Sequence, residues 1–247
     1  MQKRFLTSLI LASVFISGCS VRHKTQTTSV HPLVRDLPQT PKQQNGITVI
    51  KLEPSSYTAQ IEYDPYGKHI SQWKNTKTPE IVINGGYFEK DYSPSGFLVV
   101  AGKRIEAKLF DQDTTGLLTI TAGKVSIRDL RRNSIKQDEQ FAFALQSYPF
   151  LIKDSQPTLT IDSRKRAQRT AVGVDAEKNV YIITLYSTEL SLYEFMKELI
   201  ATGIPFTDVL NLDGGPSTGI FANWNKNNFL NDSSTKVSSI IRFQKNI

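Results

Sequence analysis

The sequence predicts an α+β domain built on a largely antiparallel or mixed β-sheet with a few covering helices. After about residue 45, most apolar runs are short, rich in β-branched and aromatic residues, and bounded by turn signals. Only one long segment has apolar residues at helical spacing. The chain has 247 residues, of which 39% are hydrophobic, and this is enough for a single domain of about 200 residues.

The N-terminal residues have the pattern of a targeting segment rather than of a folded element. Lys3 and Arg4 precede an apolar stretch from Phe5 to Ile16, which is shorter than the roughly 20 residues needed to span a bilayer. Cys19 is the only cysteine and follows Ile-Ser-Gly, which resembles the bacterial lipobox. The alternative is a buried free cysteine. We expect a signal peptide over 1–18, a lipidated Cys19 with a flexible tether over 19–45, and a domain over 46–247.

This resemblance implies a lipoprotein of the cell envelope that is attached to the membrane through its N-terminal lipid. Ser20 after the cysteine implies delivery to the periplasmic face of the outer membrane if the source is Gram-negative. Removal of residues 1–18 leaves 28 Lys and Arg against 23 Asp and Glu, a modest excess that favours anionic partners. Basic residues are not interleaved with aromatics in the way that nucleic-acid binding requires, so we expect no nucleic-acid partner.

The expected strands and turns follow in order along the domain. GITVIKLE and YTAQIEYD are expected to form an antiparallel pair, and a short helix is expected near His69–Lys74. EIVINGGYF reads as a buried strand, and FAFALQSYPFLI is a further strand candidate. Three hairpins are expected at 97–107, 116–130 and 169–187, the first two as a meander. DVLNLDGG then leads through an excursion over 223–235 to a closing strand at 237–244.

The segment SLYEFMKELIATGI predicts one amphipathic helix. Ser191 and Glu194 have the spacing of a capping box, and Gly203 supplies a stop signal. The apolar face that should cover the sheet contains Leu192, Phe195, Met196, Leu199 and Ile200.

Two apolar strands end in the same way, IVINGGYF at 81–88 and LNLDGGPS at 210–217. A polar residue, Asn84 in the first and Asp213 in the second, directly precedes a pair of glycines that lets the backbone approach a ligand closely. If the two strands lie side by side, both residues share one rim. The alternative is that each is an ordinary Asn-Gly or Asp-Gly turn.

These motifs, together with ALQSYPFLI and RTAVGVDAEKNVYIITL and in the same order and approximate spacing, resemble the phosphodiester glycosidase family over about residues 81–221. The resemblance implies a hydrolase that cleaves a sugar from a glycosyl phosphodiester in a glycan or envelope polysaccharide. The residues that match the family's motifs are Asn84, Gly85, Gly86, Phe88, Gln146, Ser147, Arg169, Thr170, Asn211, Asp213, Gly214, Gly215 and Ser217.

The implied chemistry needs only one carboxylate, because a phosphate leaves as a stable anion whereas an alkoxide must be protonated. We assign Asp213 as nucleophile or base and Arg169 as a bidentate phosphate contact. Asn84, Gln146, Thr170 and Asn211 would position sugar hydroxyls and phosphate oxygens, and N–H groups of the two glycine pairs would add donors. Arg169 could instead pair with a surface carboxylate.

Several neighbours of these motifs have two interpretations. Glu89 and Asp91 could supply a second carboxylate or lie solvated at the surface, and Tyr87 and Phe88 could stack on a sugar or belong to the core. The family usually shows a Gly-Pro pair followed by a different residue where this chain has Tyr148, Pro149 and Phe150, which bears on substrate preference.

The sequence contains no compact cluster of metal ligands, so we expect no cofactor and leave a divalent cation beside Asp213 as a minority option. The competing functions are a non-catalytic carbohydrate-binding or envelope-assembly lipoprotein and, less favoured, an acyl or peptide hydrolase that uses Ser217 or Thr218. The sugar, the polymer, the stereochemical outcome and the oligomeric state are not determined at this level.

Overall fold

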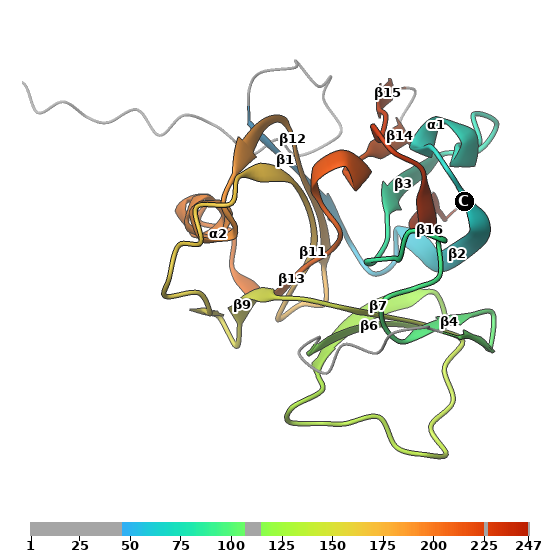
Figure 1. Cartoon of the computed structure of the whole chain (residues 1–247), viewed down its shortest axis with the longest axis horizontal. Coiled ribbons are helices and arrows are strands. Elements are labelled where there is room, and N and C mark those ends of the chain that lie inside the picture. The colour runs from blue at the N-terminus through green and yellow to red at the C-terminus, as the bar shows by residue number, and fades with distance from the viewer. Residues whose placement is uncertain (1–45, 107–114, 225–226, 247) are drawn as a thin grey trace, which may run out of the picture. The chain divides into compact units, whose positions relative to one another are not determined.

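The computed structural model describes residues 46–106, 115–224 and 227–246, which form three antiparallel sheets (Figure 1). The expected signal peptide, lipidated Cys19 and tether lie outside the described residues. No helix within the described residues is long and apolar enough to cross a membrane. The domain is β-rich with few helices, and every strand pair in these ranges is antiparallel, as predicted.

The first sheet carries one helix on its outer face. In spatial order its strands are β1 (Ile47–Leu52), β12 (Val180–Leu190), β11 (Ala167–Asp175), β13 (Phe206–Asn211), β9 (Phe150–Lys153) and β10 (Gln156–Pro157). Helix α2 (Leu192–Ala201) lies beside it in Figure 1 and packs Phe195, Met196 and Leu199 against its apolar face. Ile200, predicted on that face, is 47% exposed instead, because it lies at the edge of the apolar stripe.

The second sheet contains the strand that ends in the first glycine pair. In spatial order its strands are β15 (Asn227–Asn231), β14 (Ile220–Trp224), β3 (Glu80–Asn84), β16 (Val237–Lys245) and β2 (Tyr57–Lys68). Helix α1 (Ile70–Trp73) covers its outer face with Ile70 and Trp73, which pack on Val82 and Phe221. The expected short helix is confirmed. The β14–β15 hairpin is not predicted by the sequence, which indicates only an irregular excursion over 223–235.

The third sheet combines two predicted hairpins with a strand inserted between them. In spatial order its strands are β5 (Lys103–Ile105), β4 (Leu98–Val100), β8 (Phe143–Ser147), β6 (Gly116–Thr121) and β7 (Lys124–Asp129). Both hairpins turn at an Ala-Gly pair with positive φ at each residue, the turn geometry that matches strand twist. The predicted meander is wrong, because β8 separates β4 from β6.

One predicted pairing and one predicted strand are also wrong. β1 pairs with β12 and β2 pairs with β16, so the first two strands belong to different sheets rather than to one hairpin. The segment expected as one strand at 141–152 is two strands, β8 and β9, which join different sheets on either side of Tyr148–Pro149. Alternating apolar residues identify a strand but do not specify its partner, which depends on contacts distant in the sequence.

One apolar cluster holds the three sheets together. It takes Val172 and Leu210 from the first sheet, Ile83 and Ile241 from the second, and Leu118 from the third, all fully buried. A buried aliphatic side chain of this kind contributes about 1.5–3 kcal/mol relative to an exposed one. Because β3, β8, β11 and β13 all supply residues to this cluster, their ends are held in fixed positions relative to one another.

Candidate active site

The two glycine-flanked strand ends meet although their strands are not neighbours. β3 belongs to the second sheet and β13 to the first, so the side-by-side arrangement considered above does not occur. The Asp213 N–H nevertheless donates to the Gly85 carbonyl at 3.3 Å, and Asn84 Nδ2 donates to the Asp213 carbonyl at 2.8 Å. The predicted convergence of Asn84 and Asp213 is therefore present and is made by contact between two sheets.

Asn84 is the residue that joins these segments. It is fully buried, and its Oδ1 accepts hydrogen bonds from the Thr170 hydroxyl at 2.7 Å and from the Gly219 N–H at 3.2 Å. With Nδ2 bonded to Asp213, the side chain links β3, β11 and the segment after β13. Asn84 and Thr170 thus position the site, whereas we expected them to contact sugar or phosphate. An amide suits this position because it both donates and accepts.

Both glycines lie close to other segments of the chain. A Cβ on Gly85 would collide with the Ser239 hydroxyl and lie 3.1 Å from the Ser239 carbonyl carbon, and a Cβ on Gly214 would lie 2.8 Å from the Gln168 carbonyl oxygen. The Gly85 N–H donates to the Ser239 carbonyl and the Gly214 N–H donates to Asp213. These two N–H groups are therefore bonded within the protein, which corrects the expectation that they serve as donors to a ligand.

Asp213 is partly exposed as a residue, and the pKa of its carboxyl group is raised. Its Oδ1 accepts a hydrogen bond from the Gly214 N–H at 2.8 Å, and the Ser217 hydroxyl donates a second bond. Burial raises the pKa of Asp213 to about 6, although both hydrogen bonds favour the ionised form. Near neutral pH the group is thus a carboxylate that is more basic than an ordinary aspartate.

Arg169 is fixed next to Gly214, the residue that follows Asp213, by main-chain acceptors. Its Nε donates to the Leu190 carbonyl at 3.0 Å and its Nη2 to the Lys165 carbonyl at 2.7 Å. Nη1 would lie 3.8 Å from a Cβ on Gly214. Within the described ranges no carboxylate forms an ion pair with this guanidinium, so the surface-pairing alternative is not supported. Desolvation lowers the pKa of Arg169 from its usual value.

Two tyrosines complete the rim of the site. Asn211 Nδ2 donates to the Tyr87 hydroxyl at 2.8 Å and to the Tyr148 carbonyl at 3.0 Å. The Tyr87 hydroxyl donates to the same carbonyl at 3.1 Å, and the two rings lie 4.9 Å apart. Burial, followed by the charge of Asp213, raises the pKa of Tyr87 far above its usual value. Tyr148 is not among the predicted site residues. The one feature of the sequence that could have pointed to it is its departure from the residue usual in the family.

The other predicted residues lie behind this surface. Gln146 Oε1 accepts from the Phe97 N–H at 2.8 Å, and the Ser147 hydroxyl donates to the Asn211 carbonyl at 2.8 Å. Gly86 packs against Leu145. These residues are buried, as are Asn211 and Ser217. Of the predicted set, Asp213, Arg169, Gly214 and Gly215 combine a place at the rim with partial exposure.

The contacts of Phe88 and Glu89 show what each side chain does in the fold. The Phe88 ring stacks on Tyr92 at 5.8 Å and packs against the cluster under α1, so it belongs to the core. Glu89 accepts a hydrogen bond from the Ser95 hydroxyl at 2.6 Å within its own loop. In the part of the chain that the structure describes, no group of three or more potential ligands is arranged for a metal ion.

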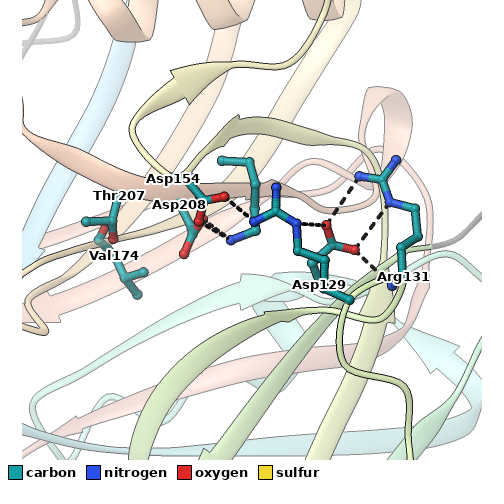
Figure 2. Close-up of polar contacts among 8 residues, drawn as sticks. Asp129, Arg131, Asp154, Val174, Thr207 and Asp208 are labelled. Atoms are coloured by element: carbon teal, nitrogen blue, oxygen red, sulfur yellow. Dashed lines mark hydrogen bonds and ion pairs between the residues drawn. The ribbon is translucent and has the colours of Figure 1, made fainter.

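A hollow of about 490 Å³ lies away from these residues, between the ends of β7 and β9. It is lined by Asp129, Arg131, Arg132, Lys153, Asp154, Gln156 and Thr158. Its lysine and arginine side chains are linked to Asp129, Asp154 and Asp208 (Figure 2). Because these charged side chains pair with one another, we interpret them as an ion-pair network that connects the first and third sheets rather than as a ligand site.

Two solved protein structures are similar to this chain. The catalytic domain of zebrafish N-acetylglucosamine-1-phosphodiester α-N-acetylglucosaminidase, auto-inhibited by its pro-peptide, is similar with a TM-score of 0.59 and 14% identity, over 76% of this chain and 73% of that chain. A hypothetical protein from Synechocystis is similar with a TM-score of 0.54 and 14% identity, over 80% of this chain and 59% of that one.

At 14% identity these likenesses show the fold. No curated protein matches the sequence. Residues 77–243 match the family model for phosphodiester glycosidases, and this range contains Asn84, Arg169 and Asp213. The chain therefore belongs to the phosphodiester glycosidase family.

Proposed function

We propose that this chain hydrolyses a glycosyl phosphodiester to a free sugar and a phosphomonoester, with Asp213 acting at the anomeric carbon. The observation that carries the proposal is one unusually basic carboxylate, Asp213, with the Arg169 guanidinium next to the following residue, Gly214, and held by main-chain carbonyls; no described carboxylate forms an ion pair with it. Membership of the family supports the reaction class. The substrate class, a sugar-phosphodiester glycan, is part of the proposal.

Asp213 supplies the carboxylate that attacks the anomeric carbon or activates a water there. A pKa near 6 keeps it ionised at neutral pH while making it a stronger base than an exposed aspartate. Breaking the bond between the anomeric carbon and the phosphate oxygen releases a phosphomonoester anion, which needs no proton in order to leave. A second carboxylate acting as general acid is therefore unnecessary.

Arg169 is the residue proposed to hold the departing phosphate. Its Nε and Nη2 already bond main-chain carbonyls, so the fork formed by these two nitrogens is occupied. The opposite edge, formed by Nη1 and the second Nη2 hydrogen, remains for a phosphate and still allows a bidentate contact. Anchoring by carbonyls rather than by an ion pair with a described carboxylate leaves this edge of the cation suited to an anionic ligand.

The test is to incubate the full chain with a panel of sugar 1-phosphodiesters and to measure free sugar and phosphomonoester. We expect release by the wild type and a roughly 10³-fold lower kcat/KM for Asp213→Asn, because the attacking oxygen loses its charge. Asp138→Asn, which changes an exposed acid, is the matched control. Sugar binding without release by the wild type would instead establish a carbohydrate-binding lipoprotein.

We also propose that the domain is attached to the cell envelope by a lipid on Cys19. The support is the basic, apolar and small-residue order that ends at this cysteine. Membrane partitioning of the wild type and of Cys19→Ala, expressed with the complete N-terminus, tests this assignment. Equal partitioning of the two would refute it.

A further inference from the structure

Tyr148 presents an aromatic ring to solvent in a fixed orientation. The residue is 37% exposed. Its carbonyl oxygen accepts hydrogen bonds from Tyr87 at 3.1 Å and from Asn211 at 3.0 Å. Its ring lies on the Tyr87 ring with centroids 4.9 Å apart and planes tilted by 37°. A surface aromatic held on both its backbone and its ring loses little entropy when a ligand binds to it.

The position of this ring places it at the proposed active site. Ser147, the preceding residue, donates to the carbonyl of Asn211, which lies two residues before Asp213. The Tyr87 ring beneath Tyr148 is close enough to Asp213 and Arg169 for both charges to act on its hydroxyl. Tyr148 is therefore joined through Tyr87 and Asn211 to the segment that carries Asp213.

We propose that the Tyr148 ring is the platform on which the sugar of the substrate stacks, and that it makes the site selective for pyranosides with an apolar face. This inference rests on the proposed function. The C–H groups on one face of a pyranose form an apolar surface, and aromatic rings bind such surfaces by burial and by contact with the π-system. Arg169 would then bind the phosphate and Tyr148 the sugar, so each half of the substrate has its own contact.

The experiment distinguishes aromatic stacking from mere side-chain volume, and binding of the sugar from binding of the phosphate. Tyr148→Phe keeps the ring and Tyr148→Leu keeps a similar apolar bulk without it. We expect Tyr148→Leu to raise KM for a sugar phosphodiester roughly tenfold at nearly unchanged kcat, and Tyr148→Phe to stay near the wild type. Inhibition by inorganic phosphate should be equal in all three. Tyr66→Leu, at a residue 79% exposed in β2, is the matched control.

The platform can also be tested without turnover. Direct binding of a methyl pyranoside and of a sugar 1-phosphate to the full chain should weaken in Tyr148→Leu and persist in Tyr148→Phe. Equal sugar affinity in the wild type and Tyr148→Leu, or equal losses in both variants, would overturn the inference. If the wild type binds these sugars through Tyr148 but releases no sugar from any phosphodiester, the platform stands and the hydrolase proposal fails.

Discussion

Asp213 should lower the stability of the fold at neutral pH while serving the reaction. Burial disfavours its ionised form, so its pKa in the folded chain is about 6 against an ordinary value of 3.8. An acid whose pKa is raised by folding binds more protons in the folded than in the unfolded state between those two values. Its contribution to stability is therefore fully present below about pH 3.8 and is lost as pH rises to about 6.

The expected size of the effect follows from the shift. A shift of about two units costs about 3 kcal/mol of unfolding free energy above pH 6, at 1.36 kcal/mol for each unit. Asp213→Asn removes this cost and keeps one oxygen that can accept from the Gly214 N–H. The shift already includes the hydrogen bonds from Gly214 and Ser217, because both lower the pKa of Asp213. We therefore expect the variant to be about 3 kcal/mol more stable at pH 8 and within about 1 kcal/mol of the wild type at pH 4.

The assay is urea unfolding of both chains at several values between pH 4 and pH 8, with the slopes compared to confirm that the unfolded states match. Asp64→Asn is a control of opposite sign, because the hydrogen bond from Lys68 lowers the pKa of Asp64. An Asp213→Asn chain that is less stable than the wild type by the same amount at every pH would refute the reasoning. The same pKa predicts that kcat/KM falls tenfold per unit below about pH 6.

Three further predictions concern single residues. Arg169→Lys should lower kcat/KM roughly 30-fold or more, because an ammonium cannot replace both carbonyl bonds and still present a fork to phosphate. Steady-state kinetics with a sugar phosphodiester would measure the loss, and near-normal activity would refute the role of Arg169. Asn84→Ala should cost about 3 kcal/mol in urea unfolding, since it leaves three partners without their hydrogen bonds, and two of them, Thr170 and Gly219, are buried. A loss under about 1 kcal/mol would contradict that role. Ser191→Ala should cost about 1 kcal/mol by removing the cap of α2, and unchanged thermal unfolding would count against it.

Local structure was predictable wherever the signal lies within a few residues. Ser191 accepts from the Glu194 N–H at 3.1 Å, and the Ser191 N–H donates to the Glu194 carboxylate at 2.8 Å, so the predicted capping box of α2 is confirmed. The Ala-Gly turns likewise form the predicted hairpins. In each case the interacting groups are sequence neighbours, so their geometry depends little on the rest of the fold.

Pairing of distant strands could not be predicted in this way. The first two strands alternate apolar and polar residues equally well, yet Val49 faces Ile183 across one sheet and Ile61 faces Ile241 across another. The meander failed for a similar reason, since Leu145 of β8 pairs with both Leu98 and Leu118. Which apolar strand fills a given gap depends on the packing of the whole core.

By itself the sequence determined the repeated glycine-flanked strand ends, the amphipathic helix and the residue types from which the site is built. Only the tertiary structure decided that Asn84 supports the site from within while Asp213 and Arg169 are partly exposed, and that Tyr148 packs on Tyr87 and bonds Asn211. The physical reason is that exposure and pKa depend on desolvation by segments far apart in the chain. Residue type and spacing specify which groups are present, and the packing of three sheets specifies which of them can meet a ligand.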